Sequence, residues 1–417
     1  MIDVKKLIIK NYKCHCGNTH ISPVDKIIIE PDARQRTAEY IKDILPSGHI
    51  ALVSFNDVNY SYDVRHNLRK AGYKISEIFY EPFTRATELN ANRLLELDES
   101  IRLIIAVGSG SISEMVKFAS YKLSIPNVII ITAPSTDSWF LPKVYLDDEQ
   151  GLKEYKGTSP SLLIADTSIT LPRALISASI GNLYSRMIGI FDFEYRNIIS
   201  GNKYCKSITE DLKSDIKQFF NEPFDYSNIE QIKRLIVCNL DVALKLGYLS
   251  DNPPVMSEDM LIRLLRLKKY NCPSAPLIAA YSLNLIYRNW LYDSRKDLFI
   301  PPERSAYYEI LNKYYNMDKM NTIRKVNEYD EKLYLKVAFT TDNMRKELIN
   351  ELDSMIPDSS KMAKNIIKIF IDNGFHMSEI IDFKVLMSYI ALAGELSPDY
   401  SLIKQIDKTG ILCHYVI

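Results

Sequence analysis

The sequence predicts a doubly wound α/β domain with a parallel, Rossmann-like sheet, followed by an all-helical domain. Up to about residue 170, short apolar strands alternate with helical stretches. The segment 102–107 (RLIIAV) is apolar at almost every position, which is typical of a strand in a parallel sheet that helices cover on both faces. After Pro172 the strands stop, and apolar residues recur at helical spacing.

Each element of the first part follows from its own pattern. Short runs rich in Val and Ile, bounded by turn residues, predict strands at 26–30, 50–54, 74–80, 102–107, 127–132 and 161–165. Helical spacing predicts helices at 32–44, 63–71, 88–97 and 113–123. Asp32 is placed to cap the first helix, because its carboxylate can accept from the amides of the first turn. Residues 134–172 show no other regular pattern.

The second part contains apolar residues at helical spacing throughout. This spacing predicts helices at 174–193, 208–220, 229–249, 258–269, 276–292, 307–315, 337–355, 362–373 and 383–393. A division near Leu171 separates an α/β domain of residues 1–170 from a helical domain of residues 171–417.

The charge balance argues against nucleic-acid or membrane partners. The 417 residues carry 52 Lys and Arg against 52 Asp and Glu, so no net field attracts a polyanion. No apolar run approaches the roughly 20 residues that cross a bilayer. Six cysteines in a chain of this length do not indicate a disulfide scaffold. We therefore expect a cytoplasmic protein that acts on a small molecule.

The strongest local signal is a glycine turn between a buried strand and a helix, Gly108-Ser109-Gly110-Ser111. Glycine lets the backbone turn tightly and approach a ligand, and the first amides of the helix favour a phosphate. Ser113 occupies the place of the third glycine of the Rossmann fingerprint, so the motif is incomplete. A tight strand-to-helix turn that binds nothing is the competing interpretation.

A second polar segment, residues 132–137 (TAPSTD), follows the next strand. Carboxyl ends of neighbouring parallel strands border one crevice, so Thr132, Ser135 and Asp137 are expected near the glycine turn. These residue types also favour turns for local reasons. Together the two segments predict a phosphate-binding crevice.

Residues 107–142 resemble the dinucleotide-binding core of glycerol-1-phosphate dehydrogenases. These enzymes share a superfamily, and a dehydroquinate synthase-like fold, with iron-containing alcohol dehydrogenases and glycerol dehydrogenase. The resemblance implies an NAD or NADP cofactor whose pyrophosphate lies on Gly108, Ser109, Gly110 and Ser111. It places Thr132 and Ser135 beside the nicotinamide and Asp137 toward the substrate. It also implies a homo-oligomer.

The same resemblance implies an acid that meets the adenosine ribose after the second strand. In this chain the segment reads Phe55-Asn56-Asp57, so Asn56 takes that position or the acid is displaced by one residue. The preference between NAD and NADP therefore stays open.

The family's divalent metal is held by one Asp and two His, and the pattern is broken in this chain. Asn182 stands in place of the Asp, Asp259 in place of the first His, and Pro273 in place of the second. No histidine occurs between His66 and His376. A neutral amide removes a full charge from the field of a cation, and imidazole is the ligand that suits Zn²⁺ and Fe²⁺. We therefore expect a degenerate metal site.

Three functions remain open. The first is an NAD(P)-dependent oxidoreductase acting on a small, phosphorylated polyol or ketone, with Asp259, Glu258 or Tyr184 as proton donor in place of the metal. The second is a catalytically inactive nucleotide- or metabolite-binding subunit that regulates or scaffolds a partner. The third is a lyase or cyclase acting on a phosphorylated sugar.

A smaller signal lies near the N-terminus, where Cys14, Cys16 and His20 occur close together. Structural zinc sites take four ligands, typically from CxxC-type knuckles. If the segment is a strand, Cys14 and Cys16 share one face and His15 points away. The sequence therefore favours an N-terminal strand or hairpin without a metal.

Overall fold

A computed structural model describes two compact units. Unit 1 comprises Met1–Ser179 and Glu222–Pro253, and unit 2 comprises Ile180–Asn221 and Pro254–Ile417. The structure describes residues 11–14, 16–56, 59–82, 84–148, 151–222, 224–249, 253–267, 274–292, 305–313, 315, 317–327, 331–355, 364, 367–368, 371, 382–397 and 400–408.

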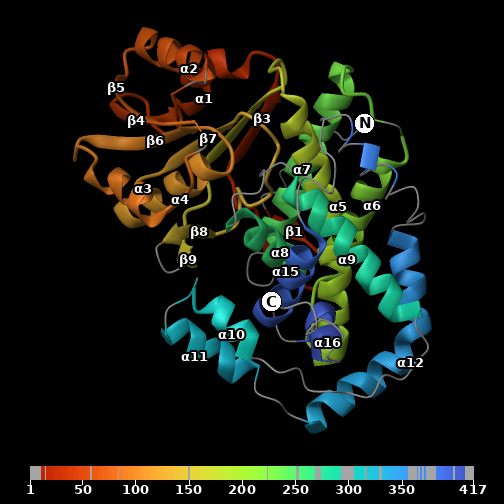
Figure 1. Cartoon of the computed structure of the whole chain (residues 1–417). Coiled ribbons are helices and arrows are strands. Elements are labelled where there is room, and N and C mark those ends of the chain that lie inside the picture. Colours follow the sequence, from red (N-terminus) through yellow and green to blue (C-terminus); the bar gives the residue numbers. More distant parts are fainter. Residues whose placement is uncertain are drawn as a thin grey trace. The chain divides into compact units, whose positions relative to one another are not determined.

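Unit 1 is built on a parallel sheet of six strands (Figure 1). The strands lie in the order β3-β10-β7-β6-β4-β5, and every neighbouring pair is parallel. Their bounds are Lys26–Glu30 for β3, His49–Phe55 for β4, Lys74–Tyr80 for β5, Ile101–Val107 for β6, Asn127–Ile131 for β7 and Leu162–Asp166 for β10. The predicted fold class is confirmed, and each predicted strand lies within one or two residues of its observed place.

Alternate side chains of β6 enter two separate cores, which is why that strand is apolar at nearly every position. Leu103, Ile105 and Val107 join a core with η2 (Ala33–Arg36), α1 (Thr37–Ile41) and α2 (Asn59–Lys70). Ile104 and Ala106 join a core with α3 (Glu88–Asn92), η3 (Arg93–Glu96), α4 (Ser111–Leu123) and α7 (Ile229–Tyr248). In Figure 1, α1 and α2 lie on one side of the sheet, and α3 and α4 on the other.

Two predicted helices of unit 1 are interrupted. The segment 32–44 forms the short helices η2 and α1, and Asp32 is not their cap, because it adopts φ 55° and makes no capping bond through its side chain. Its amide instead donates to the buried carboxylate of Asp166, at 3.0 Å. This contact with the sheet fixes the point at which the chain enters η2. The predicted helix 88–97 likewise divides into α3 and η3.

Two antiparallel hairpins complete unit 1. β1 (Asn11–Lys13) pairs with β2 (Thr19–Ile21), and β8 (Lys143–Asp148) pairs with β9 (Gly151–Lys156). The second hairpin lies inside the segment for which the sequence predicts no regular structure. Its strands, KVYLDD and GLKEYK, are rich in Lys, Asp and Glu and hold at most three apolar residues in a row.

Unit 2 is helical. α5 (Arg173–Ser200) enters it at Ile180, and its other helices are α6 (Lys206–Phe220), α8 (Ser257–Leu267), α9 (Ala275–Tyr292), α10 (Ser305–Leu311), α11 (Met317–Val326), α12 (Glu331–Met355), α15 (Phe383–Leu396) and α16 (Leu402–Lys408). α8 packs against α9 and α15, and α15 packs against α16. The sequence patterns predict all of these except α11 and α16, and the expected helix at 362–373 falls mostly outside the described residues. None of the described helices is long and apolar enough to span a membrane.

Candidate functional site

The neighbouring strands β4 and β6 define the place where a ligand of this fold is expected. The chain leaves β4 toward β5 and leaves β6 in the opposite direction toward β7, so the strand order reverses between them. In open α/β sheets a crevice lies outside the carboxyl ends of strands at such a reversal. Ser54 pairs with Val107, and Val107 pairs with Ile130. The segments that follow β4, β6 and β7 therefore start side by side at the same edge of the sheet.

The glycine turn follows β6 directly, at this reversal of the strand order. Gly108 donates its amide to the carbonyl of Ile130 at 3.0 Å, and a β-carbon on Gly108 would lie 2.9 Å from the Cβ of Ile112. Gly110 has φ 58° and ψ −113°, a conformation that side chains strongly disfavour, and a β-carbon there would meet no atom within 4 Å. Gly108 therefore leaves no room for a side chain beside Ile112. Gly110, in contrast, leaves the start of α4 uncovered, and we call this uncovered side the open face.

The first turn of α4 presents its amides toward that open face. Gly110 is the N-cap residue and supplies no side-chain capping bond. The amides of the first helical turn, from Ser111 onward, have no partner within a helix and carry the positive end of the helix dipole. This arrangement can hold a phosphate group.

Ser109 connects the glycine turn to the segment that follows β7. Its Oγ donates to the carbonyl of Ala133 at 2.6 Å and accepts from the Ala133 amide at 3.2 Å. The structure thus brings the two predicted segments together. Thr132, Ser135 and Asp137 are half-buried in the second segment, and their roles toward cofactor and substrate stay predictions.

A buried polar cluster behind this segment is absent from the sequence prediction. Glu114 accepts from the Ser138 hydroxyl at 2.7 Å and from the Tyr145 amide at 3.1 Å. Lys117, which is fully buried, donates to the carbonyls of Ser138 (2.7 Å) and Lys143 (3.0 Å). Burial lowers the pKa of Lys117. Both side chains come from α4, so the helix that begins at the glycine turn also fixes the loop beside it.

Asn56 follows β4 directly, with its side chain exposed and its amide donating to the carbonyl of Tyr80 at 2.8 Å. The register of β4 with β6 places it beside the glycine turn. Asp57, the alternative acid, lies outside the described residues.

In unit 2, Asn182 lies on α5 with its side chain buried. Its Nδ2 has no hydrogen-bond partner among the described residues. Buried amide groups are normally paired, so a water or a ligand oxygen is the expected partner of such a donor.

Arg186, one turn further along α5, forms a buried ion pair with Glu258. Its Nη1 donates to Glu258 Oε1 and to the carbonyl of Pro254, both at 2.7 Å. The Met256 amide donates to Glu258 Oε2 at 3.1 Å. Burial raises the pKa of Glu258 to about 8, although the Arg186 charge opposes that shift. Asp259 is paired instead with Arg263 on the same helix, and Pro273 lies outside the described residues.

Comparison with known proteins finds relatives for the part of the chain that holds the sheet and the glycine turn. A family model described as iron-containing alcohol dehydrogenase matches residues 28–172. The glycerol-1-phosphate dehydrogenase (NAD(P)+) of Bacillus licheniformis is 22% identical over 368 residues, covering 81% of this chain and 87% of that protein. Residues 28–172 are thus similar to iron-containing alcohol dehydrogenases, and the chain is similar at low identity to glycerol-1-phosphate dehydrogenases.

The other relatives and solved structures differ in how much of this chain they cover. The glycerol-1-phosphate dehydrogenase (NAD(P)+) of Geobacillus stearothermophilus is 23% identical over 204 residues, so the match spans about half (50%) of that protein and 46% of this chain. The archaeal Red Sea brine pool alcohol dehydrogenase ADH/D1 superposes with a TM-score of 0.61 at 12% identity, over 95% of this chain and 98% of that one. The maleylacetate reductase of Rhizobium sp. strain MTP-10005 gives 0.58 at 10% identity, over 95% and 97%. At these identities the two structures show a shared fold.

Proposed function

We propose that this protein binds NAD or NADP through the glycine turn and acts as a dehydrogenase of a small, phosphorylated polyol or ketone. The open face at Gly110 is the main support for the proposal. Its backbone conformation suits glycine, and the helix amides that follow it have no capping side chain. The relatives named NAD(P)+-dependent glycerol-1-phosphate dehydrogenases support the cofactor and the substrate class.

We propose further that this activity does not use a tightly bound Zn²⁺ or Fe²⁺. The described residues at the three aligned positions are a poor fit for such an ion. Asn182 offers a neutral amide, and Asp259 is paired with Arg263. Next to them, both oxygens of Glu258 accept hydrogen bonds. An arginine within the same cluster adds a positive charge that a metal cation would repel.

Without a metal, hydride transfer still needs a proton acceptor. Oxidation of an alcohol moves a hydride from carbon to the oxidised nicotinamide and releases the hydroxyl proton to a base. Glu258 is the candidate that the pKa favours, since a value of about 8 suits proton exchange near neutral pH. The donor Nδ2 of Asn182 is the candidate for holding the substrate oxygen.

The buried Arg186–Glu258 pair also favours a second candidate function. An ion pair that satisfies its own charges can stabilise a vacated metal site with no catalytic role. The protein would then bind a dinucleotide and regulate or scaffold a partner.

Titration with NADH and NADPH tests the binding step. The wild type is expected to bind with micromolar affinity, and Gly110→Ala to bind at least about tenfold more weakly, since it strains the turn by about 1–3 kcal/mol and blocks the open face. Gly72→Ala is the matched control, because Gly72 also has a positive φ (90°) with no atom near its absent β-carbon. Equal affinity in wild type and Gly110→Ala would contradict the assignment of the turn.

Turnover then separates the two functions. Reduction of NAD⁺ or NADP⁺ by glycerol 1-phosphate, lost in Glu258→Gln, supports the dehydrogenase. Dinucleotide binding without turnover of phosphorylated polyols or ketones supports the non-catalytic protein.

A further inference from the structure

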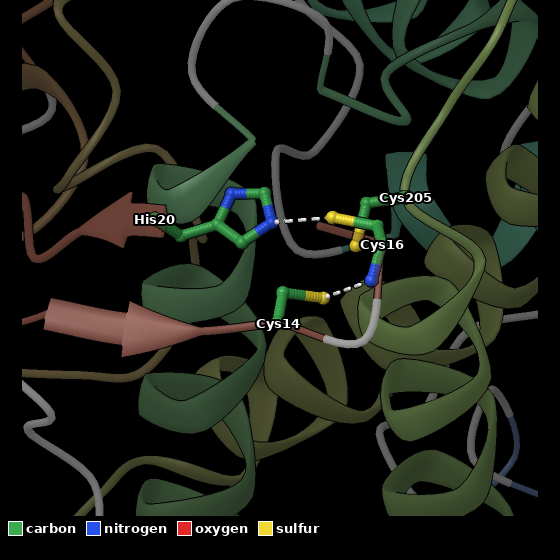
Figure 2. A group of neighbouring side chains, drawn as sticks. All are labelled: Cys14, Cys16, His20 and Cys205. Atoms are coloured by element: carbon green, nitrogen blue, oxygen red, sulfur yellow. Dashed lines mark hydrogen bonds between the residues drawn. The ribbon is translucent and has the colours of Figure 1, made fainter. Parts of the chain in front are cut away.

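The hairpin β1–β2 of unit 1 gathers two thiols and an imidazole (Figure 2). The Sγ atoms of Cys14 and Cys16 and a ring nitrogen of His20 all lie within 4.8 Å of one another. Cys16 Sγ is 3.5 Å from His20 Nε2. Cys14 is buried and Cys16 is exposed, so the group lies at the surface with one face covered.

The turn that links the strands creates this grouping. β1 ends at Lys13, so Cys14 and Cys16 belong to the turn, and the strand geometry expected from the sequence is wrong for them. Gly17 has φ 87° and donates its amide to the Cys14 carbonyl at 3.0 Å. The Cys14 amide donates to the carbonyl of Asn18 at 3.0 Å. Both bonds fold the chain back, so His20 on β2 faces the two thiols.

Hydrogen bonds orient the donors as ligands. His20 Nδ1 lies 3.2 Å from the carbonyl oxygen of Tyr248, which can only accept, so Nδ1 carries the proton and Nε2 keeps its lone pair toward Cys16. The Cys16 amide donates to Cys14 Sγ at 3.4 Å, which holds this sulfur in the turn beside Cys16. A carbonyl partner on the far nitrogen is the usual environment of a metal-binding histidine.

We propose that Cys14, Cys16 and His20 bind a structural zinc ion. Zn–S and Zn–N bonds of about 2.3 and 2.1 Å at a tetrahedral angle place sulfur and nitrogen about 3.6 Å apart, which agrees with the 3.5 Å between Cys16 and His20. A hydrogen bond between the Cys16 thiol and the His20 imidazole would also explain that distance. It would not explain why the Cys14 thiol lies beside both of them. Two thiolates and an imidazole are the soft and borderline ligands that select Zn²⁺.

This zinc is separate from the proposed nucleotide site. Through His20 it would attach the N-terminal hairpin to the end of α7, where the carbonyl of Tyr248 is the hydrogen-bond partner. A fourth ligand completes a tetrahedral structural site, and either water or another thiol can supply it.

The test measures the zinc content of the full chain after dialysis against a weak chelator. About one zinc per chain is expected in the wild type, and less than about a tenth of that in Cys16→Ser and His20→Ala. Cys16 is exposed, so its substitution is compatible with folding, whereas Cys14 is buried. Cys238→Ser is the matched control, because this buried thiol lies on α7 outside the cluster and should keep the zinc.

Cobalt substitution provides a second measurement. Co²⁺ bound by thiolates gives a charge-transfer absorption, which Cys16→Ser should weaken and Cys238→Ser should preserve. A wild type without zinc and without this absorption would overturn the proposal, as would a Cys16→Ser protein that keeps both.

Discussion

The hydroxyl of Ser109 lies 2.6 Å from the carbonyl oxygen of Ala133 and also accepts from the amide of the same residue at 3.2 Å. This double contact joins the segments after β6 and β7 into one surface. It explains how two signals that are separate in the sequence can serve one ligand.

Ser109→Ala should weaken NADH binding by about threefold to tenfold, because a net hydrogen bond contributes about 1 kcal/mol and the segment 132–137 loses its attachment to the turn. The measurement is the Kd of NADH by calorimetry. Tyr73→Phe is the control, since it also removes a hydroxyl-to-carbonyl bond, of 2.6 Å to Leu45, at the amino end of β5. A similar loss of affinity in both variants would point to general destabilisation.

Asn56→Asp should shift cofactor preference toward NADH. A carboxylate after β4 can accept from the ribose hydroxyls of NADH and repels the 2′-phosphate of NADPH. The expected change in the ratio of the two Kd values is about tenfold, or about 1.4 kcal/mol. An unchanged ratio would mean that Asn56 does not face the ribose.

Arg186→Met should destabilise the protein by about 1–3 kcal/mol, because it removes a hydrogen-bond partner of the buried Glu258 carboxyl. Glu258→Leu in the same background should recover most of that loss. Thermal unfolding of both single variants and of the double variant gives the coupling free energy between Arg186 and Glu258. If the double variant is as unstable as Arg186→Met, the pair is not the source of the effect.

Acid should weaken the sheet through His49. Its Nδ1 and Nε2 lie 2.7 and 2.9 Å from the hydroxyls of Ser100 and Ser76, and burial lowers its pKa below 6.5. Below pH 6.5, His49 takes up a proton in the unfolded chain but not in the folded chain. The stabilisation that neutral His49 gives the folded protein is therefore complete above pH 6.5 and is lost as the pH falls toward the folded pKa.

The Tm of the wild type should therefore drop more between about pH 7.5 and about pH 5 than that of His49→Gln. His66→Gln, at an exposed position on α2, should behave as the wild type. An equal drop in wild type and His49→Gln would assign the acid sensitivity to other groups.

The sequence predicts the sheet because its strands bury both faces, which leaves a run of apolar residues that no amphipathic helix would show. It does not predict β8 and β9, whose exposed faces carry Lys, Asp and Glu. Nor can helical spacing show that α7 packs on the sheet of unit 1, since the apolar face of a helix has the same period whatever it covers.

The candidate site is predictable where backbone chemistry is local, as at Gly108 and Gly110. The cluster of Glu114 and Lys117 is not, because two charged residues three positions apart on a helix usually face solvent. The same holds for Arg186 and Glu258, which meet across 72 residues of sequence. The sequence favours a strand or hairpin at Cys14 and Cys16, and it does not show that the turn at Gly17 brings them toward His20.

The most direct test of the account is the Kd of NADH measured on protein of known metal content, before and after addition of Zn²⁺ or Fe²⁺. The account predicts micromolar binding at the glycine turn that the added ion does not change. Binding that appears only after the metal is added would contradict it.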